Sequence, residues 1–304
     1  MQMVKKKICF IANPISGSRK SQNINRRFLE KHLDMQKYDF DIMHTRHKGH
    51  GMELARDAMA NGFDVITAVG GDGTVSEIGS VMIGSDKTMA IIPTGSGNGF
   101  SRDLGIPMKL QGALDVINGG KVRTVDTGKI RSQSPGNDGE WTPFLSNAGI
   151  GFDAYMSDKF DKLEKRGLWS YIKAIWQEYW SYEMHEYRLV VDGKEVTRES
   201  WLITFANATQ YGNNATIAPH ALLDDGLFDV CIVTKFPNWK LPMMLYRFFN
   251  RSIDKSGYLE VIRGKSIQVY KDLSYAQIDG DFISLNKNIE VEIEPLSLNV
   301  VVPK

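Results

Sequence analysis

The strongest constraint on the fold is a regular alternation of apolar, strand-like runs and helical patterns over the first 130 residues. The strand-like runs lie at residues 7–14, 38–45, 63–71 and 88–95. Between them, apolar residues recur at helical spacing, and several helical patterns end at glycine stops such as Gly119-Gly120. This alternation predicts βαβ units, that is, a largely parallel sheet with helices on both faces.

The pattern changes near residue 130. Residues 132–140, SQSPGNDGE, are rich in turn formers, and most later segments read as short strands separated by signals such as Asp192-Gly193 and Asp279-Gly280. This pattern favours an antiparallel sandwich or barrel, and of the two we expect a β-sandwich. Two helical segments, 158–182 and 238–251, interrupt it; core packing explains most of their apolar residues, and an acyl-chain pocket or membrane-docking surface is the alternative.

Length and charge narrow the function further. A chain of 304 residues exceeds the usual size of a single core, so we expect two domains, 1–130 and 131–296. The net charge of +1 gives no reason to expect nucleic acid as a partner. We find no apolar run long enough to span a membrane, and the run after Lys5–Lys7 is too short for a signal peptide. Cys9 and Cys231 read as buried free thiols of a cytoplasmic protein.

Three glycine-containing loops follow the first, third and fourth predicted strands. They read NPISGSRKS (13–21), GGDGT (70–74) and PTGSGNG (93–99). Such loops expose backbone N–H groups at helix amino ends and let phosphate approach closely, so three on one sheet edge predict a nucleotide site. Each loop alone is more often a tight turn. Neither the P-loop nor the dinucleotide fingerprint is present, so another phosphate-binding scheme is required.

These motifs resemble the diacylglycerol kinase catalytic family, which includes bacterial lipid kinases and sphingosine kinases. The similarity rests on NPISG, GGDGTVSE and PTGSGNGFSRDLGIP, and continues through VDTGK, NAGIGFDA, PHALLDDGLFDV and QIDGD, nearly the whole chain. The resemblance implies an α/β domain of the NAD kinase and diacylglycerol kinase type, which residues 297–304 could complete. It also implies a carboxy-terminal β-rich domain for the lipid.

The same resemblance implies an ATP-dependent lipid kinase with Mg²⁺ as cofactor. Asp72 is then assigned to metal-nucleotide organisation, with general base as its second possible role. Asp281 matches a position where bacterial relatives carry Glu, the candidate base, and Asp126 matches a third carboxylate. Read locally, Asp281 is a hairpin-turn residue and Asp126 could equally be a solvated strand-end residue.

The binding residues that the loops and the resemblance suggest form a larger set. For ATP they are Asn13, Ser16, Gly17, Thr45, Gly71, Asp72, Gly73, Thr74, Glu77, Thr94, Gly95, Ser96, Gly97 and Asn98. Asp153 is the candidate for the lipid substrate, with Asp158 as its alternative. Asp224 and Asp225 match a segment that holds a structural Mg²⁺ in some bacterial members, and a simple turn is an equally good interpretation.

The acceptor is left open between diacylglycerol and a sphingoid base. Gly95-Ser96-Gly97-Asn98-Gly99 lacks the Asp that bacterial diacylglycerol kinases usually carry, which tilts the comparison slightly toward sphingosine kinases. A NAD kinase-like enzyme and a non-catalytic lipid- or nucleotide-binding protein are the alternatives. As partners we expect a lipid, transient contact with the inner face of a membrane, and possibly a second copy of the chain.

Overall fold

The computed structural model describes residues 5–133, 139–161, 176–179, 182–271, 275–285 and 288–304. Most of the predicted helix 158–182 therefore lies outside the described residues. The chain divides into two compact units: 1–125 together with 296–304, and 126–295. No helix in the described part is both long and apolar enough to cross a membrane.

The first unit is built on the predicted parallel sheet. Its strands are β1 (Lys6–Ala12), β2 (Tyr38–His44), β3 (Val65–Gly70), β4 (Thr88–Pro93) and the end of β16 (Asn288–Val302). The order is β2-β1-β3-β4-β16, and neighbouring strands run parallel. The central strands β1 and β3 are apolar and buried almost throughout, as strands covered on both faces must be.

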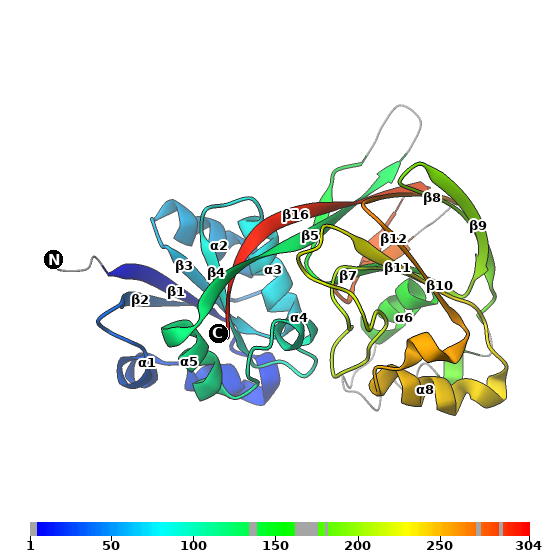
Figure 1. Cartoon of the computed structure of the whole chain (residues 1–304). Coiled ribbons are helices and arrows are strands. Elements are labelled where there is room, and N and C mark those ends of the chain that lie inside the picture. Colours follow the sequence, from blue (N-terminus) through cyan, green and yellow to red (C-terminus); the bar gives the residue numbers. More distant parts are fainter. Residues whose placement is uncertain (1–4, 134–138, 162–175, 180–181, 272–274, 286–287) are drawn as a thin grey trace. The chain divides into compact units, whose positions relative to one another are not determined.

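Helices cover both faces of this sheet. They are η1 (Ser16–Asn23), α1 (Arg26–His32), α2 (His50–Ala60), α3 (Asp72–Met82), α4 (Gly99–Asp103) and α5 (Leu110–Gly119). Figure 1 shows α2 and α3 on one face and α1 and α5 on the other. Asn25 caps α1, because its side chain accepts a hydrogen bond from the Phe28 N–H at 3.0 Å.

The second unit is the predicted antiparallel sandwich. One layer is a six-stranded sheet in the order β12-β11-β10-β7-β14-β15. Its strands are β7 (Asn147–Gly151), β10 (Leu202–Ala206), β11 (Phe228–Val233), β12 (Leu259–Gly264), β14 (Tyr275–Ile278) and β15 (Asp281–Ser284). The other layer contains β5 (Lys121–Gln133), β6 (Thr142–Phe144), β8 (His185–Val191), β9 (Lys194–Ser200), β13 (Ser266–Tyr270) and the start of β16.

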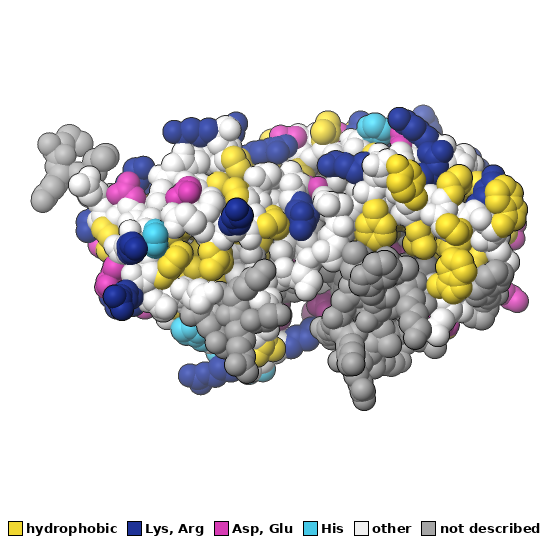
Figure 2. Space-filling model, turned by 90° about the horizontal axis from the view of Figure 1, so that it is seen from below, with side chains coloured by type: hydrophobic (Ala, Val, Ile, Leu, Met, Phe, Trp, Pro, Cys, Tyr) yellow, Lys and Arg dark blue, Asp and Glu magenta, His cyan; other side chains and the backbone are white. Residues whose placement is uncertain are grey.

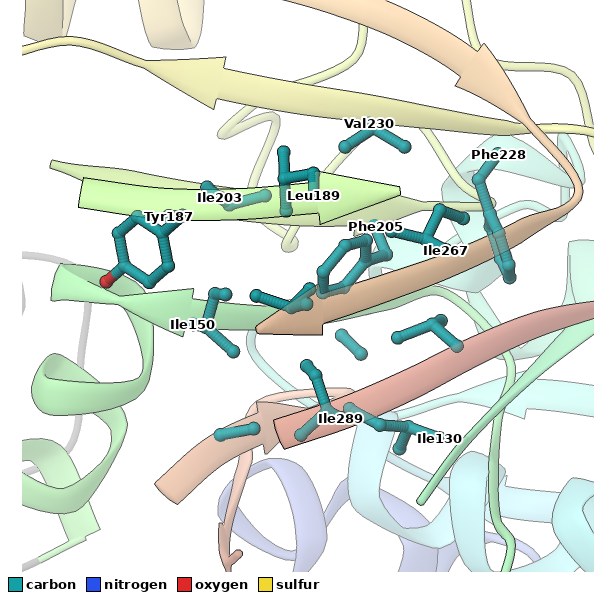
Figure 3. Close-up of a cluster of buried hydrophobic side chains, with 14 of the residues drawn as sticks. Ile130, Ile150, Tyr187, Leu189, Ile203, Phe205, Phe228, Val230, Ile267 and Ile289 are labelled. Carbon is teal, nitrogen blue, oxygen red and sulfur yellow. The ribbon is translucent and has the colours of Figure 1, made fainter. Parts of the chain in front are cut away.

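Buried side chains from both layers form the sandwich core. Ile150, Ile203 and Phe205 come from the six-stranded sheet, and Leu189 and Ile267 come from the other layer. Figure 3 shows these side chains pointing toward one another between the strands. Apolar side chains that point inward from the strands of both layers fill this core.

Short helices complete the second unit. They are α6 (Phe152–Asp161), η2 (Asn238–Lys240), α8 (Leu241–Phe249) and η3 (Ile253–Ser256). A second buried cluster lies beneath α6 and α8 and includes Phe152, Trp201 and Met244. Cys231 belongs to it, and both cysteines are buried and free, as expected.

Candidate functional site

The three glycine loops meet at the carboxyl edge of the parallel sheet, as predicted. They follow β1, β3 and β4, which are consecutive in the sheet order. Side chains link the loops: the Thr94 hydroxyl donates to Ser16 Oγ at 3.0 Å, and Asn13 Nδ2 donates to Thr74 Oγ1 at 3.3 Å. The loops therefore form one surface at the position where α/β sheets bind ligands.

Two of the loop glycines are required by contacts between the loops themselves. Gly17 has φ +59°, and a Cβ there would lie 1.5 Å from the Thr94 carbonyl oxygen. A Cβ on Gly95 would lie 2.4 Å from the Cα of Gly71. These residues are glycine because backbone packs on backbone at this edge.

Gly73 has no such explanation. A Cβ placed there would meet no atom within 4 Å, although Gly73 lies in the first turn of α3, where alanine would favour the helix. The helix begins after Gly71, and no side chain caps it. Its first-turn N–H groups, which have no intrahelical partners, and its positive dipole end suit an anion. The open space at Gly73 is thus where a phosphate can approach this helix.

Asp72 joins the second loop to the third. Its Oδ2 accepts the Asn98 N–H at 2.7 Å, and its Oδ1 accepts the Gly99 N–H at 2.8 Å. Asn98 has a left-handed φ of 53°, and its Nδ2 donates to the Gly95 carbonyl at 2.8 Å. The Asn98 Oδ1 is buried and has no hydrogen-bond partner among the residues described. The bonds to Asp72 and Gly95 fix the Asn98 side chain, so that its Oδ1 can accept a hydrogen bond beside the loops.

Glu77 and Thr45 lie beside the loops with structural contacts of their own. The Glu77 carboxylate accepts the N–H groups of Gly49 at 2.8 Å and Gly51 at 3.0 Å, which fixes the start of α2 against α3. Thr45 is buried, and its N–H donates to the Ala12 carbonyl at 3.0 Å. Their predicted contacts with ATP stay predictions.

In the second unit, Asp126 is fully buried and shapes a turn. Its Oδ2 accepts the Gly226 N–H at 2.7 Å, and its own N–H donates to the Leu223 carbonyl at 2.6 Å. Asp126 therefore fixes the segment that carries Asp224 and Asp225.

The neighbouring Asp225 has a cationic side chain as its partner. Its carboxylate forms an ion pair with Arg263 and accepts the Leu227 N–H at 3.2 Å. Arg263 also pairs with Asp229 at 3.0 Å. Because a guanidinium already neutralises Asp225, the structure adds no support for the predicted Mg²⁺ at this residue. Within the described part of the chain, the group of three or more potential metal ligands is His47, His50 and Glu53.

The QIDGD segment forms a hairpin, and its first Asp, Asp279, acts as a clamp that holds the backbone of residues 145–147. Asp279 has φ 50° and Gly280 φ 90°, which joins β14 to β15 tightly. The Asp279 carboxylate accepts N–H groups from residues 145, 146 and 147 at 2.9, 2.7 and 3.2 Å. Sequence reasoning predicted the turn and missed the clamp, which no local pattern signals. Asp281 begins β15 and is partly exposed.

The second unit also contains an open apolar pocket. Its walls include Trp201 and Phe236 and the inward side chains Leu241, Met244 and Phe248 of α8. Asp153, the predicted lipid-binding residue, lies in this wall beside Tyr211. The pocket therefore contains a single carboxyl group in a wall that is otherwise mostly apolar.

Asp153 is buried among uncharged partners. Its Oδ2 accepts hydrogen bonds from Gln277 Nε2 at 3.0 Å, the Tyr211 hydroxyl at 3.1 Å and the Thr204 hydroxyl at 3.4 Å. Burial raises the pKa of Asp153 to about 6, and the three hydrogen bonds act in the lowering direction. No Lys or Arg of the described chain pairs with it.

Known proteins match both halves of the chain. The family model of the diacylglycerol kinase catalytic domain matches residues 7–130, and that of the YegS C-terminal NAD kinase beta sandwich-like domain matches residues 146–302. A diacylglycerol kinase of Mycobacterium tuberculosis H37Rv is 30% identical over 254 residues, covering 83% of this chain and 81% of that protein. One of Bacillus subtilis 168 is 30% identical over 242 residues, covering 76% and 74%.

Solved structures share the fold. A diacylglycerol kinase from Bacillus anthracis Sterne superposes with a TM-score of 0.72 at 22% identity, covering 98% of this chain and 97% of that one. Yeast NADH kinase in complex with NADH superposes with a TM-score of 0.53 at 9% identity, covering 99% and 85%. The α/β unit followed by a β-sandwich is therefore an architecture that these kinases have in common.

Proposed function

This chain belongs to the family of the diacylglycerol kinase catalytic domain, and on that premise we propose that its acceptor is the free hydroxyl of diacylglycerol. It is an ATP-dependent lipid kinase, as its family and relatives show. The lipid-kinase relatives weigh against the alternatives of a NAD kinase-like enzyme and a non-catalytic binder. The finer assignments below rest on the geometry of each unit.

The observation that supports ATP at the three loops is the uncapped amino end of α3 with its open glycine. Backbone N–H groups there suit phosphate oxygens, and the space beside Gly73 lets them approach. The buried Asn98 Oδ1 would gain a donor from a bound ligand or an ordered water. We assign the loop residues 13–17, 71–74 and 94–98 to the nucleotide on these grounds.

Asp72 fits the predicted Mg²⁺. Its two oxygens are held by the N–H groups of residues 98 and 99, and a carboxylate oxygen either accepts hydrogen bonds or coordinates a cation. Mg²⁺ prefers such oxygen ligands and needs only one or two carboxylates. When bound, the cation would neutralise charge between Asp72 and phosphate oxygens. The two N–H bonds hold the carboxylate in place for this task.

Phosphoryl transfer needs one proton acceptor. The lipid hydroxyl oxygen bonds to the γ-phosphorus, the bond to the β,γ-bridging oxygen breaks, ADP leaves, and the hydroxyl proton passes to a base. We assign the base to Asp281, which is partly exposed at the start of β15 and is held by the hairpin that Asp279 anchors. Asp126, with its carboxylate on the Gly226 N–H, acts as a positioning residue for the neighbouring turn.

The apolar pocket of the second unit is our site for the lipid's acyl chains. Its walls are almost entirely aliphatic and aromatic, as the walls of small-molecule sites usually are. A diacylglycerol hydroxyl or ester group would meet its polar side chains, Asp153 and Tyr211.

A sphingoid base is the second candidate, because of Asp153. A buried carboxylate with only uncharged partners would be stabilised by an ammonium group, which diacylglycerol lacks and a sphingoid base carries. Asp153→Asn separates the two acceptors. If the acceptor is a sphingoid base, this change removes its counter-charge and lowers turnover steeply; if it is diacylglycerol, turnover changes by only a few fold.

The test is an acceptor panel with γ-labelled ATP and Mg²⁺. Wild type, Asp153→Asn and Tyr211→Phe would each receive diacylglycerol, sphingosine or NAD, with labelled products identified by mass spectrometry. We expect labelled phosphatidic acid as the product. Asp153→Asn and Tyr211→Phe should form it at similar rates. Labelled sphingoid phosphate that Asp153→Asn abolishes would transfer the assignment to the second candidate, and labelled NADP would overturn both. The predicted homodimer stays a prediction.

A further inference from the structure

The helix α8 carries apolar side chains on two opposite faces. Leu241, Met244, Leu245 and Phe248 recur at helical spacing and line the pocket. The outer stripe consists of two exposed aromatic side chains, Trp239 in η2 and Tyr246 in α8. Trp239 is 77% exposed and Tyr246 is 66% exposed. A helix of a globular protein normally turns polar residues outward, and two exposed aromatic side chains on one helical face are typical of a contact surface.

The charge around this stripe is strongly positive. Residues 235–255 contain Lys235, Lys240, Arg247, Arg251 and Lys255 against the single acid Asp254, in a chain whose net charge is only +1. None of these five cations forms an ion pair with an acidic side chain of the described chain. Lys240 instead lies over the rings of Trp239 at 5.1 Å and Tyr258 at 4.8 Å. Arg251 and Lys255 are exposed, whereas Lys235, Lys240 and Arg247 are half-buried, so the exposed basic charge at this surface comes mainly from Arg251 and Lys255.

We infer that residues 238–255, the α8 face, dock on an anionic lipid bilayer. Trp and Tyr favour the boundary between water and hydrocarbon, and Lys and Arg beside them bind phosphate headgroups. Figure 2 shows hydrophobic side chains gathered on the second unit, toward the right of the view, with Lys and Arg side chains next to them. The composition of an interfacial helix is thus present on a surface that the fold leaves exposed.

Docking of the α8 face has a consequence for the lipid site. The helix whose outer stripe would rest on the bilayer forms a wall of the pocket with its inner stripe. One short helix then separates membrane from pocket, so substrate has a short route between them. This step rests on the proposed function, because it takes the pocket to be the acyl-chain site.

The test measures binding to sucrose-loaded vesicles of phosphatidylcholine alone or mixed with phosphatidylglycerol. We expect wild type to sediment with the anionic vesicles and to dissociate as salt increases. Arg251→Gln with Lys255→Gln removes two exposed charges and should lower the partition coefficient roughly 25-fold, since each basic residue near an anionic surface contributes about fivefold. Trp239→Ala with Tyr246→Ala should lower it at least as much.

A matched control and a soluble substrate keep the outcomes distinct. Lys121→Gln with Val122→Ala removes one exposed charge and one exposed apolar side chain from the first unit, and should bind like wild type. Phosphorylation of water-soluble dihexanoylglycerol should be the same in all these proteins. Absence of that activity refutes the proposed function and not the docking. Absence of vesicle binding by wild type, equal binding to neutral vesicles, or wild-type binding by the Trp239 and Tyr246 variant would each overturn the docking.

Discussion

At the scale of single residues, Asp153 is a carboxyl group whose ionisation is costly to the fold. Its carboxyl is buried with uncharged partners, and its pKa is raised from 3.8 to about 6. The folded protein therefore binds a proton more tightly there than the unfolded chain does. Stability must fall as pH rises from about 4 to about 6, because the folded state then has to bury a charge.

This predicts a pH-dependent effect of Asp153→Asn. Above pH 7 the variant should be more stable than wild type by about 1 to 3 kcal/mol, since two pKa units correspond to about 3 kcal/mol and some hydrogen bonding is lost. The difference should shrink toward zero near pH 4. Urea unfolding at pH 8, 6 and 4 measures it, with exposed Asp57→Asn as the control. A difference that does not change with pH would show that Asp153 does not ionise in this range.

Asp279 is a residue whose importance is invisible in the linear sequence. It accepts three N–H groups from residues more than 130 positions away. Asp279→Ala should lower the free energy of unfolding by about 3 kcal/mol, because buried donors lose a charged acceptor and a left-handed backbone loses its tolerant residue. Asp279→Asn should lower it less. Urea unfolding that ranks the two variants equally would contradict this account of the clamp.

At the scale of elements, the uncapped start of α3 gives a test of the phosphate site. Gly73→Ala meets no atom within 4 Å, so it should leave folding intact or slightly stabilise the helix. If phosphate approaches there, the added methyl should weaken ATP binding about tenfold or more. Gly119→Ala is the matched control, because Gly119 also lies in a helix, α5, and a Cβ added there would likewise meet no atom within 4 Å. Calorimetric titration with Mg-ATP measures the affinity of each variant for ATP. Equal affinities would contradict the assignment of Gly73 to the phosphate site.

The elements themselves could be predicted well, because each has a local cause. The apolar runs 7–14, 38–45, 63–71 and 88–95 correspond to β1 to β4, and the order of alternation implied a parallel sheet with three loops at one edge. What could not be predicted are contacts between distant backbone groups. The bonds from Asp72 to residues 98 and 99 depend on β3 and β4 being neighbours, which no single window of sequence contains.

For the same reason, the sequence left two alternatives open for some segments, and only the contacts in the folded chain decide between them. Asp225 reads as a turn residue or a metal ligand, and its partner Arg263 lies 38 positions away. The helix 238–251 reads as core or as a docking surface. The structure separates its two faces, since Leu241 and Met244 are buried while Trp239 and Tyr246 are exposed.

At the scale of the whole molecule, two units share one chain that passes between them along β5 and β16. In the proposed mechanism, the first unit supplies the loops with Asp72, and the second supplies Asp126, Asp281 and the pocket. In that mechanism, transfer of phosphate from nucleotide to lipid depends on residues of both units. The account therefore predicts that one substitution in the first unit stops lipid phosphorylation while the fold of both units survives.

The most direct test is the initial rate of labelled phosphatidic acid formation from γ-labelled ATP, Mg²⁺ and dihexanoylglycerol. Wild type, Asp72→Asn and the control Asp192→Asn would be compared, since Asp192 likewise accepts two backbone N–H groups, from residues 265 and 266. We predict transfer by wild type and Asp192→Asn, and a loss of about 100-fold or more in Asp72→Asn with cooperative unfolding retained. Transfer by Asp72→Asn near the wild-type rate, or no labelled lipid with wild type, would contradict the account.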